Sequence, residues 1–225
     1  MGNFDDIAKE YDKWYTTKAG AFADLIETQT AIGMLVINPG AKILDIGCGT
    51  GNFSIKLAEL GYQVTGIDIS KRMLEQAKRK AQAKSLDIQF HAMDVHNLEF
   101  PDNHFDGAVS MAAFEFIAKP DEAFIEMMRV LKPGGQILIG TINSESSWGQ
   151  FYMDRGSQKD SIFRHSKFMN PNELKDLDRK NLMSFRECLF FSPLTPDKHI
   201  SMEEEKRLST VNKGGFICAT WKKPV

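Results

Sequence analysis

The chain has 225 residues, 42% of them hydrophobic, and its 28 Lys and Arg nearly balance its 30 Asp and Glu, giving a net charge of −2. At this length one domain can bury a core without disulfides or metals, which excludes a disordered chain and a small cross-linked scaffold. The charge balance argues against binding to nucleic acid or to an anionic membrane, because contacts with a phosphate backbone need an excess of Lys and Arg.

The cysteines and the N-terminal sequence bear on the cellular compartment. The cysteines are far apart and form no CxxC pair, so neither a disulfide framework nor a zinc site is predicted for Cys48, Cys188 and Cys218. No His, Cys and carboxylate side chains stand at ligand spacing, and we expect no bound metal. The N-terminus lacks a basic segment followed by an apolar one, and no apolar run approaches a membrane span. We therefore expect a cytoplasmic protein.

Strand and helix patterns alternate through the middle of the chain. Short apolar runs predict strands, and apolar residues three or four apart predict helices between them. Ser70 is a candidate N-cap of one helix and Asp121 of another. In chain order we expect strands at 42–46, 63–69, 88–92, 105–110 and 136–141, with helices after the first, second and fourth of them. Such units predict a parallel α/β sheet with helices on both faces and ligands at the carboxyl ends of its strands.

Two regions fall outside this alternation. Residues 4–38 are predicted to form a helical arm rich in aromatic side chains. About forty residues separate Thr141 from the next strand signal near Phe185, although connections in α/β units are usually short. We expect the insertion, residues 142–182, to be a functional lid rather than a linker.

A strand that ends in closely spaced glycines lies between Ile43 and Asn52, with Gly47, Gly49 and Gly51 in its turn. Glycines at a strand-to-helix turn let a nucleotide-like ligand approach the backbone. Asn52 stands where a dinucleotide fingerprint has Gly or Ala, which counts against an NAD-dependent oxidoreductase. The preceding Asp45 would repel a pyrophosphate but hold an ammonium group, directly or through the loop.

Two further carboxylates follow the next strands. Asp68 ends the second strand about 20 residues after Gly47, where a ribose-binding acid is expected. After the third strand, Asp94 is placed to accept from an adenine amine while Met93 and Val95 pack on the ring. Together the three acids describe a ligand with an ammonium, a ribose and an adenine but no phosphate. S-adenosylmethionine fits that description.

Five motifs in this order resemble those of class I S-adenosylmethionine-dependent methyltransferases, in the type 11, ubiquinone/menaquinone-biosynthesis-like group. The resemblance covers roughly residues 40–141, and the opening of the arm is also similar to the arm that folds over the cofactor in this group. The motifs are Ile43–Gly61, Val64–Leu74, Gln89–Val95, Phe105–Ser110 and Arg129–Gly135.

The resemblance implies a Rossmann-like, doubly wound sheet of seven strands, mostly parallel with the last strand antiparallel. The final two strands would then be Phe185–Phe191 and Gly215–Trp221. On this basis residues 1–225 form a single methyltransferase domain. Its parts are the arm (4–38), the cofactor-binding core (40–141), the insertion (142–182) and the last two strands (183–225).

The resemblance also assigns cofactor contacts by position. Gly47 and Gly49 would line the methionine moiety, Asp68 the ribose, and Asp94 with Val95 the adenine. At the adenine edge and at the floor after the fourth strand, it places Ile69, Met73 and Met111.

In-line transfer from a sulfonium needs alignment in a partly dry pocket more than an obligatory catalytic residue, and it leaves S-adenosylhomocysteine. His165 and Tyr11 are candidates for a catalytic role. Candidate substrate contacts are Trp148, Tyr152, Arg164 and His165. We expect a small-molecule methyl acceptor and a monomer or homodimer. Two alternatives stay open: a non-catalytic S-adenosylmethionine-binding or regulatory protein, and a protein methyltransferase.

Overall fold

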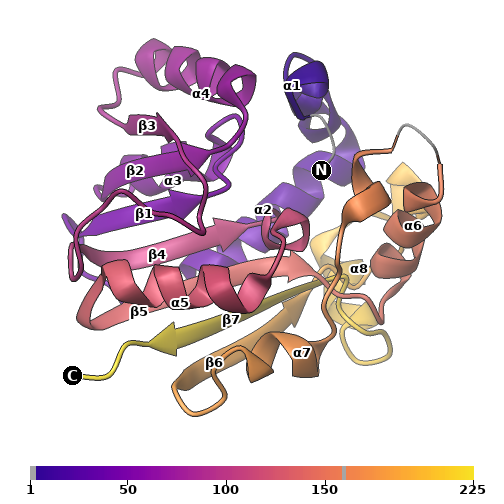
Figure 1. The fold of residues 1–225 in the computed structure, drawn as a ribbon. Helices are drawn as coiled ribbons and strands as arrows, with labels where there is room; N and C mark the ends of the chain where they lie inside the picture. Colours follow the sequence, from indigo (N-terminus) through magenta and orange to yellow (C-terminus); the bar gives the residue numbers. More distant parts are fainter. Residues whose placement is uncertain (1–3, 159–160) are drawn as a thin grey trace.

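A computed structural model describes residues 4–158 and 161–225 and shows one seven-stranded sheet flanked by helices (Figure 1). The order of strands across the sheet is β3-β2-β1-β4-β5-β7-β6. The strands are β1 (Lys42–Ile46), β2 (Gln63–Asp68), β3 (Gln89–Ala92), β4 (Phe105–Met111), β5 (Leu131–Ile142), β6 (Leu182–Cys188) and β7 (Phe216–Lys222).

The pairing of the strands confirms the predicted topology. β1 to β5 are parallel neighbours, and β7 runs antiparallel to both β5 and β6. β6, however, spans Leu182–Cys188 rather than the predicted Phe185–Phe191. Leu189 has a φ of 65°, which breaks the extended backbone. Phe191 instead packs into the core beside Phe22 and Trp148.

Helices cover both faces of the sheet. They are α1 (Phe4–Ile7), α2 (Lys18–Ile32), α3 (Asn52–Glu59), α4 (Lys71–Ala83), α5 (Pro120–Val130), α6 (Ser147–Gly156), α7 (Pro171–Asp176) and α8 (Met202–Leu208). Single 3-10 turns lie at η1 (Tyr11–Thr16), η2 (Phe114–Phe116), η3 (Ile162–His165) and η4 (Asp197–His199). Apolar residues of α2 and α3 bury one sheet face, and those of α5 and α7 bury the other.

The caps of two helices test the predicted helix starts. Ser70 caps α4 as predicted, because its side chain accepts from the backbone N–H of Met73. The prediction for Asp121 is wrong: α5 begins at Pro120, with Lys119 at the N-cap and no side-chain cap bond. Proline suits the first helical position, where its missing N–H is not needed, so Asp121 falls in the first turn.

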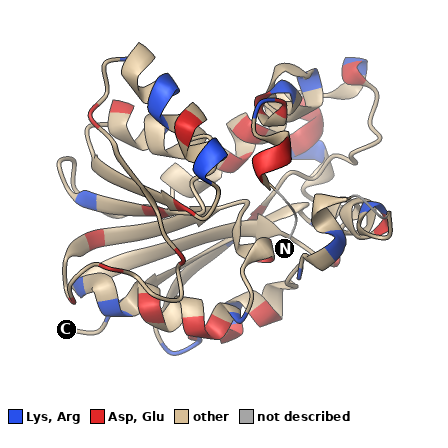
Figure 2. Ribbon diagram, turned by 45° about the horizontal axis from the view of Figure 1, so that its top comes forward, with Lys and Arg blue, Asp and Glu red and all other residues tan. Residues whose placement is uncertain are grey.

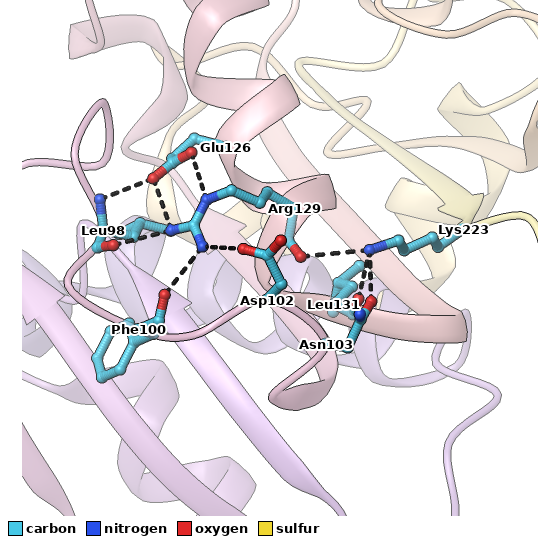
Figure 3. Close-up of polar contacts among 8 residues, drawn as sticks. All are labelled: Leu98, Phe100, Asp102, Asn103, Glu126, Arg129, Leu131 and Lys223. Atoms are coloured by element: carbon cyan, nitrogen blue, oxygen red, sulfur yellow. Dashed lines mark hydrogen bonds and ion pairs between the residues drawn. The ribbon is translucent and has the colours of Figure 1, made fainter.

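Arg129, in the last predicted motif, has a structural role (Figure 3). Its guanidinium makes two bonds to the Glu126 carboxylate, both 2.8 Å, and one to Asp102 at 2.6 Å. It also donates to the carbonyl oxygens of Leu98 and Phe100. These bonds tie the loop between β3 and β4 to α5, and they lie away from the glycine turn after β1.

The connection from β6 to β7 was not anticipated as a structured segment. It contains η4 and α8, and the buried Glu205 of α8 accepts from the backbone N–H of Phe190 at 2.8 and 2.9 Å. Acidic and basic side chains alternate on the helices around the sheet, whose strands carry few of them (Figure 2). In the described part of the chain, every helix is too short or too polar to span a membrane.

Candidate functional site

Three adjoining cavities open at the carboxyl ends of the parallel strands. β1 lies between β2 and β4, so the loops after β1 and β4 leave in opposite directions and a crevice forms between them. We call the cavities A, B and C. Tyr11 of the arm and Ala112 after β4 line all three, so the cavities meet at these two residues.

Cavity A gathers most of the predicted cofactor residues. It is also lined by Phe4 and Phe116, whose rings pack edge to face with centroids 4.9 Å apart. The predicted residues that line it are Gly47, Gly49, Asp68, Ile69, Met73, Met93, Asp94 and Val95. Residues at the ends of β1, β2 and β3, far apart in the sequence, therefore line one apolar slot, as the parallel sheet predicts.

The glycine turn needs glycine at its first position for two reasons. Gly47 has a φ of 66°, a left-handed conformation that side chains rarely adopt. A Cβ on Gly47 would lie only 2.5 Å from the Cβ of Ala113, which follows β4. Gly51, by contrast, lines none of the three cavities among the described residues. A Cβ there would meet Ala77 of α4 at 3.0 Å, so Gly51 serves close helix packing.

Asp68 is positioned by the backbone on both sides. One carboxylate oxygen accepts from the N–H of Gly49 at 2.9 Å, and the other accepts from the N–H of Ser70 at 2.8 Å. Burial raises the pKa of Asp68, while these two bonds oppose the rise. Each oxygen keeps a free lone pair, so the fixed carboxylate can accept from the two hydroxyls of a ribose.

Asp94 lies at the open side of cavity A. It accepts from the backbone N–H of His96 at 2.9 Å and contacts the ring Nδ1 of His96 at 2.6 Å. These bonds lower the pKa of Asp94 and keep it ionised. The carboxylate is 58% exposed, so it remains accessible to an adenine amine at the cavity edge.

Cavity B is lined by acidic groups from two elements. Asp45 of β1 is 1% exposed and accepts from the Ser54 hydroxyl at 2.5 Å. Burial raises the pKa of Asp45 to about 7, with the neighbouring Asp68 adding to the rise. Asp24 and Glu27 of α2 also line cavity B, and Asp24 is paired with Lys56 at 2.6 Å. Met111 lines this cavity as well.

The arm is fastened across cavities A and B by two aspartates. Asp5 accepts from the hydroxyl of Ser70, the N-cap of α4, at 2.5 Å. Asp12 accepts from Thr50 at 2.7 Å and from Lys80 at 2.8 Å. The predicted arm therefore does fold over the turn after β1, and both of its attachment points lie in the cofactor-binding core.

Cavity C lies between the arm, α2, the segment after β4 and the insertion. Its volume is about 470 Å³, within the range of roughly 300 to 1,000 Å³ that small-molecule sites occupy. A chain of aromatic rings walls it: Phe116 contacts Phe163, Phe163 contacts Tyr152, and Tyr152 contacts Trp148, with centroids 5.6, 4.5 and 6.0 Å apart.

Two carboxylates face this aromatic cavity. Glu27 is half-buried and lines both B and C. Burial raises its pKa well above the usual value, with Asp24 and Glu115 adding to the rise. Glu115 is 2% exposed and accepts from the Thr141 hydroxyl at 2.9 Å. Burial raises the pKa of Glu115 to about 7.

The candidate acceptor-side residues separate into two groups. Trp148 and Tyr152 line cavity C, whereas Arg164 and His165 are exposed at the end of η3 and lie outside its described lining. His165 borders a different surface pocket beside Lys119. Tyr11 lies where the three cavities meet, and burial raises its pKa to about 12, so its phenol stays protonated at neutral pH and keeps an O–H that can donate a hydrogen bond.

Sequence reasoning missed Glu27 and Glu115. Glu115 carries a usable signal, because it stands between Phe114 and Phe116 directly after a strand that ends at the ligand edge. Glu27 carries none, since nothing local distinguishes it from the other polar residues of α2.

The lining chemistry of cavities A and B fits S-adenosylmethionine. Within residues 4–158 and 161–225, neither cavity is lined by Lys or Arg, so a phosphate would find no cation there. The same ranges contain no group of three or more His, Cys, Asp or Glu placed to hold a metal ion. A carboxylate for a ribose, an apolar slot and acids near an ammonium position are all present.

The comparisons with known proteins agree with this chemistry. A family model described as a methyltransferase domain matches residues 44–139. A phosphatidylethanolamine N-methyltransferase of Cereibacter sphaeroides is 32% identical over 139 residues, which are 60% of this chain and 67% of that enzyme. An uncharacterized protein of Methanocaldococcus jannaschii is 29% identical over 99% of this chain and 100% of its own length.

Among solved structures, a Thermotoga maritima protein described as an S-adenosylmethionine-dependent methyltransferase, possible histamine N-methyltransferase, is 25% identical with a TM-score of 0.74. The match covers 98% of both chains. The fold is thus that of a class I, Rossmann-like methyltransferase. This chain belongs to the methyltransferase domain family that its motifs predicted, and it is an enzyme that uses S-adenosylmethionine as cofactor.

Proposed function

We propose that this enzyme transfers the methyl group in line to a small-molecule acceptor bound in cavity C. The observation that carries the proposal is the junction at Tyr11 and Ala112, where cavity C meets the two cavities of the cofactor site. An acceptor in C would lie beside the methionine end of a cofactor whose adenosine occupies A. The Thermotoga relative is likewise described as a possible methyltransferase of a small molecule, histamine.

The bound cofactor supplies a methyl group that its sulfonium already activates, so the chain contributes alignment and exclusion of water. Gly47 and Asp68 fix the cofactor at the turn and at the ribose. The arm and the insertion meet over cavity C through Phe116, which contacts Phe4 of the arm and Phe163 of the insertion. We assign both segments the role of a cover over the acceptor.

The test uses S-adenosylmethionine with a trideuterated methyl group, incubated with the enzyme and a metabolite extract separated into small-molecule and protein fractions. We expect the label in the small-molecule fraction, identified by mass spectrometry. Label in the protein fraction alone would instead identify a protein methyltransferase. Tight binding of S-adenosylhomocysteine without any labelled product would identify a regulatory binding protein.

A variant that fills cavity C provides the matched comparison. Ile162 lines the cavity, and Ile162→Trp is expected to lower methyl transfer about fivefold or more, since overpacking a formed site costs ~1–3 kcal/mol. Its affinity for S-adenosylhomocysteine should stay unchanged. Ile125→Trp, on the exposed surface of α5, should change neither quantity.

A further inference from the structure

Resting on the proposed function, we propose that the acceptor is an amine that enters cavity C as an ammonium ion and is held there by Glu27 and Glu115. The enzyme would then be an N-methyltransferase. Both carboxylates line cavity C, and Glu27 also lines cavity B, so it lies on the boundary between cofactor and acceptor.

The Glu27 carboxylate gives the first indication of an ammonium ligand, because it has no hydrogen-bond or ion-pair partner among the described residues. Among residues 4–158 and 161–225, no hydrogen bond or ion pair to the Glu27 side chain is present, whereas Asp24 on the same helix is paired with Lys56. A carboxylate withdrawn from bulk water and left without a donor costs free energy. A ligand that brings N–H donors and a positive charge removes that cost.

The charges around cavity C give the second indication. The acidic residues that line it are Glu10, Glu27 and Glu115, and its described cationic lining residue is Arg155, which is exposed and stacks on the Phe151 ring at 4.3 Å. Burial and the like charges of Asp24 and Glu115 raise the pKa of Glu27, so Glu27 and Glu115 repel when both are ionised in this dry site. An ammonium placed between them reverses that repulsion, while a neutral or anionic acceptor leaves it unrelieved.

The aromatic walls give the third indication. Tyr11 and Tyr15 lie with ring centroids 5.9 Å apart on the arm side, and Tyr152 and Phe163 lie 4.5 Å apart on the insertion side. The faces of such rings attract cations at close range. A cavity that combines aromatic rings with the Glu27 and Glu115 carboxylates discriminates an ammonium from a hydroxyl of the same size.

In the transfer step, the Glu27 carboxylate acts as the proton acceptor. The ammonium gives one proton to the Glu27 carboxylate, which frees the nitrogen lone pair. The nitrogen attacks the methyl carbon, a nitrogen–carbon bond forms, and the carbon–sulfur bond breaks with its electron pair moving to sulfur. The products are a methylated ammonium and S-adenosylhomocysteine, and the proton leaves Glu27 to solvent after release.

The binding test uses enzyme saturated with S-adenosylhomocysteine and isothermal titration calorimetry with matched probes: ethylamine, benzylamine and phenethylamine, each beside its alcohol. We expect at least one ammonium to bind at least about tenfold more tightly than its alcohol, as expected for charge-assisted hydrogen bonds. Glu27→Gln should remove that preference and leave the affinities for the alcohol and for S-adenosylhomocysteine unchanged. Glu99→Gln, an exposed change of equal charge, should keep the preference.

Three results would overturn the inference. One is that no ammonium in the series binds more tightly than its alcohol. Another is that Glu27→Gln weakens S-adenosylhomocysteine instead, which would assign Glu27 to the cofactor's own ammonium. The third is a trideuteromethyl product carrying its label on oxygen, carbon or sulfur, in which case the proposed small-molecule function stands and the amine does not. Label found only in protein would remove both.

Discussion

The cofactor-binding core and the acceptor cavity are built in opposite ways. Around cavities A and B, the predicted cofactor residues lie at or just after strand ends within residues 45–111, the arm and α2 add further lining residues, and backbone N–H groups fix Asp68. Around cavity C, the walls come from the arm, α2, η2, the insertion, the β6–β7 connection and β7. A site that binds an invariant ligand is encoded locally, while a site that selects a ligand is assembled from distant segments.

The largest expected effect is on cofactor binding in cavities A and B, and it comes from closing the glycine turn after β1. Gly47→Val puts a branched side chain at a φ of 66° and against Ala113, so we expect affinity for S-adenosylhomocysteine to fall at least about 100-fold. Gly61→Val is the control, because Gly61 has a φ of 88° but no atom within 4 Å. It should lose stability through the same backbone strain and keep its affinity, measured by calorimetry. Equal losses in both variants would show that strain, not closure of the site, is responsible.

Glu115, which lines the acceptor cavity C, should make the stability of the protein depend on pH. Its pKa lies near 7 in the fold against an ordinary value of 4.5, so the folded state keeps a proton that the unfolded state loses between these values. Its contribution to stability is therefore largest below pH 4.5 and declines as the pH rises towards 7. Glu115→Gln should remove about 3 kcal/mol of that decline, measured by urea unfolding without ligand from about pH 5 to about pH 8.

The exposed Glu122→Gln is the control for this measurement and should keep the wild-type slope. Asp45, with a pKa near 7, contributes a decline of the same sign, so the Glu115→Gln curve should be flatter than that of the wild type rather than flat. A Glu115→Gln curve parallel to the wild-type curve would contradict the buried, protonated state of this side chain.

Asp68 and Asp94 both line cavity A but should contribute unequally to cofactor affinity. Asp68→Asn loses a carboxylate that two backbone N–H groups hold in place, so affinity for S-adenosylhomocysteine should fall about 30-fold, or ~2 kcal/mol. Asp94→Asn changes a carboxylate that is 58% exposed and should cost less than about fivefold. Calorimetry with both variants checks the order, and a larger loss for Asp94→Asn would reverse the assigned importance of ribose and adenine contacts.

Releasing the arm from the cofactor-binding core should have the smallest effect on stability. Lys80→Met removes the bonds from Lys80 to Asp12, Thr50 and Asn52. We expect a loss of stability within ~1 kcal/mol, because the pair is partly exposed, but about fivefold faster amide hydrogen exchange across residues 4–17. Lys84→Met, at the C-terminal end of the same helix α4, breaks an exposed pair with Glu59 of α3 and should leave exchange in the arm unchanged. Equal exchange in the two variants would mean that Asp12 does not hold the arm.

The sequence could predict most of the cofactor half because its evidence is local. Strand ends are recognised from short apolar runs, and Asp68 and Asp94 stand within one or two residues of those ends. The same logic does not position Gly51, since periodicity does not say which element this glycine faces; in the structure a Cβ there would meet Ala77 of α4 at 3.0 Å. That logic failed at Asp121, where the fixed φ of Pro120 sets the helix start.

For the acceptor cavity C, the sequence showed mainly that the connection 142–182 is unusually long. Which residues of 142–182 face the cavity depends on how η3 packs against Phe116, a contact between segments far apart in sequence, and on how α6 packs against η3. For this reason Trp148 and Tyr152 were predicted beside Arg164 and His165 although only the first pair lines cavity C. Glu27 requires the docking of α2 on the sheet before its position has any meaning.

The place of β7 in the sheet has a consequence for how the chain is synthesised and folds. β6 joins the sheet only through β7, which lies between it and β5 and follows it in the chain by 27 residues, 189–215. While the ribosome is still making that connection, β5 presents an unpaired edge and β6 has no partner strand. Chaperone capture of nascent chains should therefore be strongest after β5 is complete and before β7 is, since an open β-edge is the surface most prone to wrong pairing.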